Sequence, residues 1–194
     1  MSLLFALSRA IESRDPYASG HGARVTVIAQ TIATRLGWDD DRIDVLRLGA
    51  ALHDIGKLTV SVDVLGKPGP LSDEELEHVR RHPAAGARMI ELIPSLRPAV
   101  AGVRHHHERW DGEGYPDGCS GAAIPSEARI LAAADAFDAM TSDRPYRPAL
   151  SSERAIAEME RCAGSQFDPA IVSALVEAWH AGELDQSELL RAAS

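Results

Sequence analysis

The segment His53-Asp54-Ile55-Gly56-Lys57 directly follows an apolar helical repeat over residues 43–52 and is the strongest local signal in the chain. A carboxylate next to an imidazole offers a hard oxygen and a borderline nitrogen, a combination that suits Fe, Mn or Zn better than Ca. Taken alone, such a pair is more often a helix C-terminal histidine followed by a capping aspartate. Whether this pair binds a metal or only ends a helix therefore depends on the rest of the sequence.

The segments on both sides of this pair also have helical patterns. Apolar residues recur with the helical period over residues 24–36 and stop at Gly37. Ser72 and Glu75 form a capping box that predicts a helix from there to about residue 92. Further helices are predicted over residues 98–105 and 125–140, and from an Asp168-Pro169 start. Only residues 67–70 and 111–125, rich in Gly and Pro, are predicted to be irregular. The sequence predicts an all-α fold.

Length, charge and cysteine content limit the classes of protein that the chain can belong to. A chain of 194 residues suits one domain, which buries roughly 70% of its unfolded surface. Its net charge of −9 argues against binding to a nucleic acid polymer or to an anionic membrane. The two cysteines show no disulfide or metal-ligand pattern, and no apolar run is long enough to span a membrane. We therefore expect a cytoplasmic protein without membrane insertion.

Other histidines and one aspartate lie on several of the predicted helices. His21 is near the start of the first helix, His82 is late in the helix predicted over residues 72–92, and His105–His107 end another. Asp135 interrupts an apolar stripe, where a buried carboxylate needs a counter-charge. Each of these residues alone would be structural more often than functional. Helices that each direct a His or Asp into one core are, however, typical of a metal site in a helix bundle.

Two further segments suggest contacts with a phosphate-containing ligand. The three histidines are followed directly by a loop over residues 108–116 that contains two glycines and two aromatic residues. Its simplest structural explanation is a turn in which Gly112 and Gly114 adopt positive φ. Farther along, Arg144 and Arg147 flank Tyr146. Arginine forks bind phosphate in a bidentate manner and a tyrosine can stack on a base, whereas the alternative is a solvated helix end.

Taken in order, these motifs resemble the HD-GYP family. The resemblance covers residues 11–176, nearly the whole chain, and the complete ordered set is far more specific than any His-Asp pair. The matching segments are His21-Gly-Ala-Arg24-Val25, His53-Asp54-Ile-Gly-Lys57, Lys67-Pro68-Gly69, His82-Pro83, His106-His107-Glu108, Asp111-Gly112-x-Gly114-Tyr115-Pro116, Ile124-Pro125, Asp135 and Arg144-Pro145-Tyr146-Arg147.

The resemblance implies an HD-domain helical bundle, with a single HD-GYP domain over residues 1–194 that has its core at about 11–176 and a C-terminal helical extension. It also implies a centre for two divalent metal ions, Fe or Mn before Zn. The expected ligands of the first metal are His21, His53, Asp54 and Asp135. Those of the second metal are Asp54, His82, His106 and His107, so that Asp54 bridges the two metals. His78, His105 and His180 match no ligand position.

The same resemblance assigns contacts with the substrate. Lys57, Arg144 and Arg147 occupy positions that contact the substrate phosphates in this family, and Tyr115 belongs to the signature Gly-Tyr-Pro loop, which is a wall beside the site. Tyr17 stands where some members carry an additional acidic ligand. Because a neutral phenol is a poor ligand, we expect two metals per chain and not three.

These expectations define a phosphodiesterase mechanism. Two cations roughly 3.5–4 Å apart can hold a bridging hydroxide and bind phosphate oxygens. Attack on phosphorus would open cyclic di-GMP to the linear pGpG, and a second cut would give GMP. Asp54 and Lys57 are the expected catalytic residues. The alternatives are an HD phosphohydrolase for another nucleotide such as cyclic GMP-AMP, and a non-catalytic cyclic di-GMP receptor. The resemblance leaves open a homodimer and an upstream sensor or receiver domain.

Overall fold

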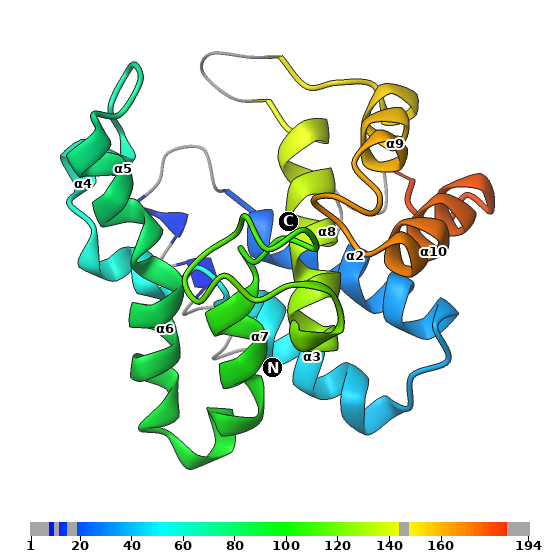
Figure 1. Ribbon diagram of the computed structural model, residues 1–194, viewed down its shortest axis with the longest axis horizontal. Coiled ribbons are helices and arrows are strands. Elements are labelled where there is room, and N and C mark those ends of the chain that lie inside the picture. Colours follow the sequence, from blue (N-terminus) through cyan, green and yellow to red (C-terminus); the bar gives the residue numbers. More distant parts are fainter. Residues whose placement is uncertain (1–7, 10–11, 15–18, 144–147, 186–194) are drawn as a thin grey trace.

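The computed structural model describes residues 8–9, 12–14, 19–143 and 148–185, and helices dominate this part of the chain (Figure 1). The described residues contain no named strand, only one isolated bridge between Ala163 and Phe167. The all-α prediction is confirmed. The α-helices and 3₁₀ helices (η) are α2 His21–Arg35, α3 Asp40–Leu52, η1 Ile55–Thr59, α4 Val62–Leu65, α5 Asp73–Arg80, α6 His82–Glu91, η2 Pro94–Ala99, α7 Val100–His105, η3 Gly121–Ala123, α8 Ser126–Thr141, α9 Ser152–Arg161 and α10 Pro169–His180.

Helix α8 lies at the centre of the larger hydrophobic core and packs against α2, α7, α9 and α10 (Figure 1). Phe137 and Leu131 of α8 are almost completely buried together with Ile28 and Ile32 of α2. A smaller cluster that includes Leu52, Ile90 and Val103 joins α3, α6 and α7. The two cores hold the ends of α2, α3, α6 and α7 in fixed positions.

The helix predicted over residues 72–92 is in fact two helices, α5 and α6, and this prediction was wrong in its extent. The capping box at Ser72 and Glu75 is present as predicted. Arg81 separates the two helices as the C-cap of α5 and the N-cap of α6, just before His82 and Pro83. Pro83 has no N–H to donate to the carbonyl of Val79, four residues earlier, and that carbonyl accepts from His82 Nδ1 over 2.8 Å. The first helix therefore stops, and Pro83 lies in the first turn of the second, where a missing N–H costs nothing. His82 therefore begins α6 and does not lie late in a longer helix.

Other local predictions agree with the structure more closely. Asp168 caps α10 through a bond from the Ala170 N–H, with Pro169 at the first turn. The segment predicted over residues 98–105 begins as η2 and continues as α7. Helix α9 was not predicted, although Ser151 caps it through the Arg154 N–H and its apolar residues face the core. Both cysteines are free thiols, in agreement with the sequence analysis.

Gly56 in η1 is required for the close approach of η1 to α6. A β-carbon built at this position would overlap the backbone carbonyl of His82 and lie 2.6 Å from the Gly86 nitrogen. Both obstacles are backbone atoms of α6, which cannot rotate away. The absence of a side chain at residue 56 therefore allows His82 to lie beside Asp54.

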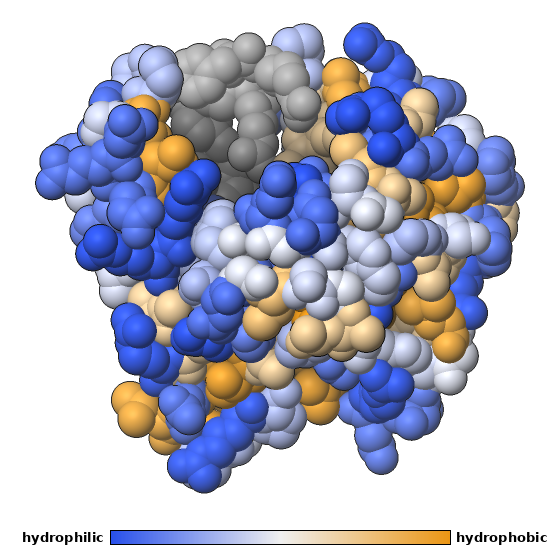
Figure 2. Space-filling view, viewed as in Figure 1, coloured by the Kyte–Doolittle hydropathy of each residue, from blue (hydrophilic) through white to orange (hydrophobic). Residues whose placement is uncertain are grey.

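The surface has no large continuous apolar face on the side shown in Figure 2, where hydrophilic residues surround scattered hydrophobic ones. Among the residues that the structure describes, the most exposed large apolar side chain is Leu92, just after α6, which is 81% exposed. In the part of the chain that the structure describes, no helix is both long enough and apolar enough to cross a membrane.

Candidate metal centre

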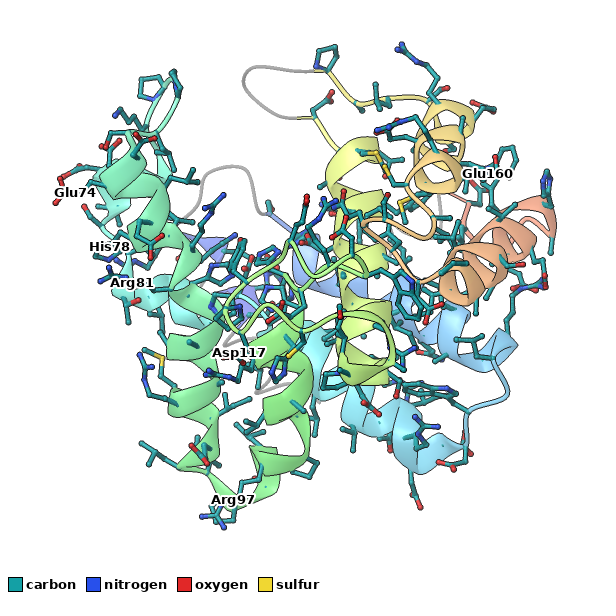
Figure 3. The ribbon with its side chains drawn as sticks, viewed as in Figure 1. Glu74, His78, Arg81, Arg97, Asp117 and Glu160 are labelled. Atoms are coloured by element: carbon teal, nitrogen blue, oxygen red, sulfur yellow. The ribbon has the colours of Figure 1, made fainter. Side chains whose placement is uncertain are left out.

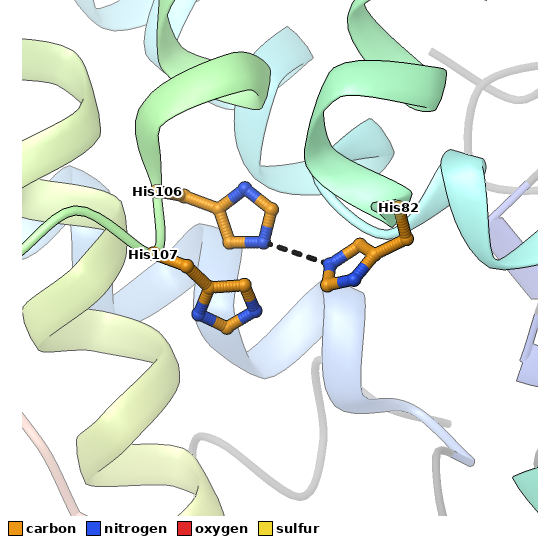
Figure 4. Close-up of side chains that lie close together, drawn as sticks. All are labelled: His82, His106 and His107. Atoms are coloured by element: carbon orange, nitrogen blue, oxygen red, sulfur yellow. Dashed lines mark hydrogen bonds between the residues drawn. The ribbon is translucent and has the colours of Figure 1, made fainter. Parts of the chain in front are cut away.

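Six of the seven predicted metal ligands form two adjacent groups of three. His21, His53 and Asp54 make the first group, and His82, His106 and His107 make the second; in each group the ligand atoms lie within 4.8 Å of one another. Figure 4 shows the second group, with the three rings turned toward a common point between α6 and α7. The seventh residue, Asp135, places Oδ1 3.4 Å from His21 Nε2, at the edge of the first group.

These side chains come from the ends of four helices that meet at one place. His21 is the first residue of α2, and His53 follows the last residue of α3. His82 is the first residue of α6, and His106 follows the last residue of α7. Helix ends leave backbone carbonyl and amide groups without intrahelical partners. Side chains located there can use these backbone groups to fix their orientation.

Three of the histidines use such carbonyls in the same way. The Nδ1 atom of His53, His82 and His106 donates to the carbonyl oxygen three residues earlier, over 2.7, 2.8 and 2.8 Å. Because a carbonyl oxygen can only accept a hydrogen bond, each Nδ1 must carry the proton. Each Nε2 then keeps its lone pair and points into the centre. A backbone partner on the second ring nitrogen is typical of metal-binding histidines.

The short distance between the facing Nε2 atoms of His82 and His106 indicates whether this set of donors fits a metal. Their Nε2 atoms lie 3.3 Å apart (dashed line in Figure 4). With both Nδ1 atoms protonated, two lone pairs face each other in a buried space. This arrangement is unfavourable by itself and becomes favourable when a cation shares both lone pairs. The residues therefore fit a divalent metal with nitrogen and oxygen ligands.

Asp54 belongs to the first group and lies next to the second, so that one carboxylate oxygen faces the histidines of each group. Its Oδ1 is 3.3 Å from His82 Nε2, whereas its Oδ2 is 3.5 Å from His53 Nε2 and 4.0 Å from His21 Nε2. Lys57 Nζ donates to the same Oδ2 over 2.7 Å. Burial favours the protonated acid, but Lys57 and the surrounding histidines outweigh it and hold the pKa of Asp54 well below its usual range. The carboxylate is thus ionised, as a metal ligand must be.

Burial lowers the pKa of most of the imidazoles, because it disfavours their protonated, charged form. It lowers the pKa of His53, and together with the neighbouring rings it lowers the pKa of His106 well below the ordinary value. The pKa of His107 falls to about 3, first because of burial and then because of His82. These rings are neutral at neutral pH. Neutral imidazole is the form that binds metals, so little free energy is lost in deprotonating them.

His21 has a different environment, built around a residue that the sequence analysis missed. Its Nδ1 lies 2.7 Å from Oδ2 of Asp138, which is only 2% exposed and also accepts from Arg24 Nε over 2.6 Å. Burial alone would lower the pKa of His21, but the bond to Asp138 and the charges of Asp135, Asp138 and Asp54 raise it. The same carboxylates attract a cation to Nε2 in place of the proton. Asp138 therefore orients the His21 ring.

We expect Asp138→Ala to weaken metal binding at the first group by roughly 10- to 100-fold, as is usual when a carboxylate partner of a metal-binding histidine is removed. The reason is that His21 would lose the acceptor that fixes its ring, and Arg24 would lose its counter-charge. Metal affinity measured by competition with a chromophoric chelator would check this. Asp44→Ala, at an exposed carboxylate paired with Arg47, is the control. Equal affinities of the two variants would contradict the role of Asp138.

The Gly-Tyr-Pro loop closes one side of the second group. The ring of Tyr115 packs on His107 with centroids 5.0 Å apart, and burial raises the pKa of Tyr115 to about 12, so that the phenol keeps its proton. Glu108 holds the loop, because its Oε1 accepts from the N–H groups of Asp117 and Gly118 over 2.7 and 3.1 Å. A β-carbon at Gly114 would overlap the backbone of Glu108 and Arg109. These contacts hold the loop in place beside the second group.

The remaining predicted residues fall into two classes. His78 and His105 interact elsewhere, with the Thr59 carbonyl and with Asp117, and His180 lies at the end of α10 beside Trp179. The predicted substrate residues Arg144 and Arg147, and Tyr17 with its bearing on a third metal, lie outside the described residues.

Comparison with known proteins places this arrangement in a family. The sequence model of the HD domain family matches residues 6–171. The chain belongs to the HD domain family. Within it, the chain is similar to the cyclic di-GMP phosphodiesterase response regulator RpfG of Xanthomonas campestris, with 41% identity over 175 residues that cover 89% of this chain and 46% of the relative. It is also similar to the 3′3′-cGAMP-specific phosphodiesterase 3 of Vibrio cholerae, with 38% identity over 91% of this chain and 38% of the relative.

A solved structure supports the HD-domain fold independently. The cyclic GMP-AMP-specific phosphodiesterase V-cGAP3 of V. cholerae superposes with a TM-score of 0.75 at 20% identity, over 98% of this chain and 52% of that chain. The predicted HD-domain helical bundle and the resemblance to HD-GYP phosphodiesterases are thereby confirmed. This HD domain spans less than half the length of the two relatives named above.

Proposed function

We propose that this HD domain is a metal-dependent phosphodiesterase that hydrolyses cyclic di-GMP to pGpG, with GMP as the product of a second cut. The observation that carries the proposal is the position of Asp54, whose two carboxylate oxygens face two separate groups of metal-binding side chains. A carboxylate shared in this way is typical of two-metal phosphoester hydrolases. No structural role requires six ionisable side chains to converge in a buried space.

The proposed cofactors are two divalent ions, Fe or Mn before Zn, because the donors are mainly imidazole nitrogens with carboxylate oxygens. His21, His53, Asp54 and Asp135 would hold the first ion, and His82, His106 and His107 would hold the second together with Asp54. Bound there, the ions would activate water and neutralise charge on the phosphate.

The chain's own residues would direct the cleavage. Hydrolysis adds a hydroxyl group to phosphorus and a proton to the ribose 3′-oxygen as the P–O3′ bond breaks. Lys57, held by Asp54 beside both groups, would stabilise charge on the phosphoryl oxygens. Tyr115 would bound the substrate pocket from the side of His107. Arg144 and Arg147 are retained as proposed phosphate contacts on the basis of sequence.

A second candidate substrate is 3′3′-cGAMP. The observation that favours it is the 38% identity to a V. cholerae relative named as specific for this dinucleotide. The two substrates share the phosphodiester ring and one guanine, so the same metal centre could cleave either. A receptor without catalysis is the weakest alternative, because all seven predicted ligand positions are occupied by ligand-type residues.

The setting in which the domain works is also a proposal. The longer relatives favour an upstream sensor or receiver domain that controls hydrolysis. A homodimer and a cytoplasmic location remain predictions from the sequence.

The test is an assay of protein loaded anaerobically with Fe²⁺ or Mn²⁺, with both cyclic dinucleotides as substrates and chromatography of the products. We expect two metals per chain by elemental analysis and conversion of cyclic di-GMP to pGpG. Removal of the metals by a chelator should abolish turnover, and Mn²⁺ should restore it, because the residues alone offer no activated nucleophile. Tight binding without hydrolysis under every metal would favour the receptor, and preferential cleavage of 3′3′-cGAMP would favour the second candidate.

A further inference from the structure

Arg80 lies beside the proposed metal centre but has no part in it. It is the last residue of α5, two positions before His82. Its guanidinium carbon is 5.6 Å from the centroid of the Tyr115 ring, and that ring lies 5.0 Å from the ring of His107. Tyr115 thus contacts both His107 of the second group and Arg80, which is exposed to solvent.

The charge of Arg80 has no acidic partner among the residues that the structure describes. Its only recorded contact there is with the face of Tyr115. The next residue, Arg81, pairs with Glu77 at 3.8 Å and lies on the outer edge of α5 and α6, away from the loop that carries Asp117 (Figure 3). Elsewhere, arginines such as Arg104 and Arg109 form bidentate pairs with carboxylates. Arg80 is therefore available to an incoming anion or hydrogen-bond acceptor.

An aromatic ring beside an available guanidinium matches the chemistry of a purine base. Tyrosine offers a face on which a base can stack, and each base stacked in this way contributes on the order of 1–3 kcal/mol. The arginine fork matches the O6 and N7 acceptors of guanine, whereas adenine presents an amino donor at position 6. The recorded contact of Arg80 is with Tyr115, whereas Lys57 is the cation that bonds to Asp54 at the metal groups, so Lys57 suits the scissile phosphate and Arg80 suits a base.

We propose that Arg80 is a specificity-determining residue that recognises a guanine base of the dinucleotide, with Tyr115 as its stacking platform. This inference rests on the proposed phosphodiesterase function. It adds a preference for guanine over adenine at one of the two base positions. It also assigns this preference to the junction of α5 and α6 and not to the metal ligands.

The experiment compares Arg80→Ala, Arg80→Lys and the matched control Arg81→Ala in the metal-loaded protein. Cyclic di-GMP and 3′3′-cGAMP are assayed as substrates, and cyclic di-AMP is measured as a competitive inhibitor. We expect Arg80→Ala to lower kcat/KM for cyclic di-GMP roughly 10- to 100-fold, chiefly through KM, because a bidentate contact to guanine is lost. Arg80→Lys should not restore it, since an ammonium group lacks the planar fork. Inhibition by cyclic di-AMP and the metal content should not change, and Arg81→Ala should resemble the wild type.

Three results would overturn the assignment. If Arg80→Ala weakened cyclic di-GMP turnover and cyclic di-AMP inhibition equally, Arg80 would act through its charge and not through recognition of guanine. Restored turnover of cyclic di-GMP in Arg80→Lys would lead to the same conclusion. Equal kinetics of Arg80→Ala and Arg81→Ala would remove Arg80 from the substrate site. Absence of turnover in the metal-loaded wild type is a different result, because it contradicts the proposed function itself and not the role of Arg80 within it.

Discussion

Asp54→Ala is expected to abolish hydrolysis and to release both metals. The Asp54 carboxylate faces His82 with one oxygen and His21 and His53 with the other, so its removal deprives both groups of a charged ligand at once. A lost ligand of this kind costs several kcal/mol of transition-state stabilisation, which corresponds to a rate decrease on the order of 1,000-fold or more. Turnover of cyclic di-GMP and elemental analysis of the same sample would measure both effects.

Two companion variants make this test specific. Asp63→Ala removes an exposed carboxylate from nearby α4 and should leave metal content and rate unchanged. Asp54→Asn keeps the size of the side chain but not its charge, and should behave like Asp54→Ala. Near-normal metal content in a folded Asp54→Ala protein would show that the carboxylate does not bridge the two groups.

Gly56→Ala is expected to lower the stability of the folded protein strongly, although Gly56 is not a proposed ligand. The added methyl group would overlap the backbone of His82 and Gly86, and backbone atoms cannot move aside as a side chain can. Overpacking of this kind typically costs 1–3 kcal/mol, and we expect about 3 kcal/mol or more here. For a chain of this size, that corresponds to a fall in Tm of roughly 6–12 °C. If the protein folds, α6 should be displaced and the affinity of the second group for metal should fall.

Thermal unfolding with and without Mn²⁺ would check this expectation. Gly66→Ala is the matched control, because its backbone φ of −92° suits any residue. Its new β-carbon would lie 3.3 Å from the Val62 carbonyl oxygen, which a shift of a few tenths of an ångström relieves, whereas the overlap at Gly56 is far larger. An unchanged Tm and unchanged metal affinity in Gly56→Ala would show that α6 and η1 can separate without consequence.

Local signals in the sequence predicted the fold well. Ser72 with Glu75 and Asp168 with Pro169 each carry their capping chemistry within three residues, so the helices they begin could be predicted without knowledge of partners. The division between α5 and α6 was missed because the helical periodicity continues through it. Pro83 was the available signal, since proline lacks the N–H that a continuous helix needs at that position but is favoured in the first turn of a new helix.

The candidate site shows the limit of such prediction. The ligand-type residues could be found because His and Asp are chemically distinctive and match family motifs. Asp138 could not be found in this way, because its partner His21 is 117 positions away and only folding reveals the contact. Its spacing of three residues from Asp135 on α8 was the one local hint, since residues three apart share a helix face. Arg80 was missed for a similar reason: its neighbour Tyr115 lies on a distant loop.

The distribution of the proposed ligands along the chain links metal supply to the folding of this domain. They extend from His21 to Asp135 and come from the ends of α2, α3, α6 and α7 and from α8, so bound ions would cross-link distant parts of the polypeptide much as disulfides do. A ligand that binds only the folded state adds about 2.7 kcal/mol when present at 100 times its Kd. Scarcity of the metal would then lower the free energy of unfolding of the protein as well as slow its reaction.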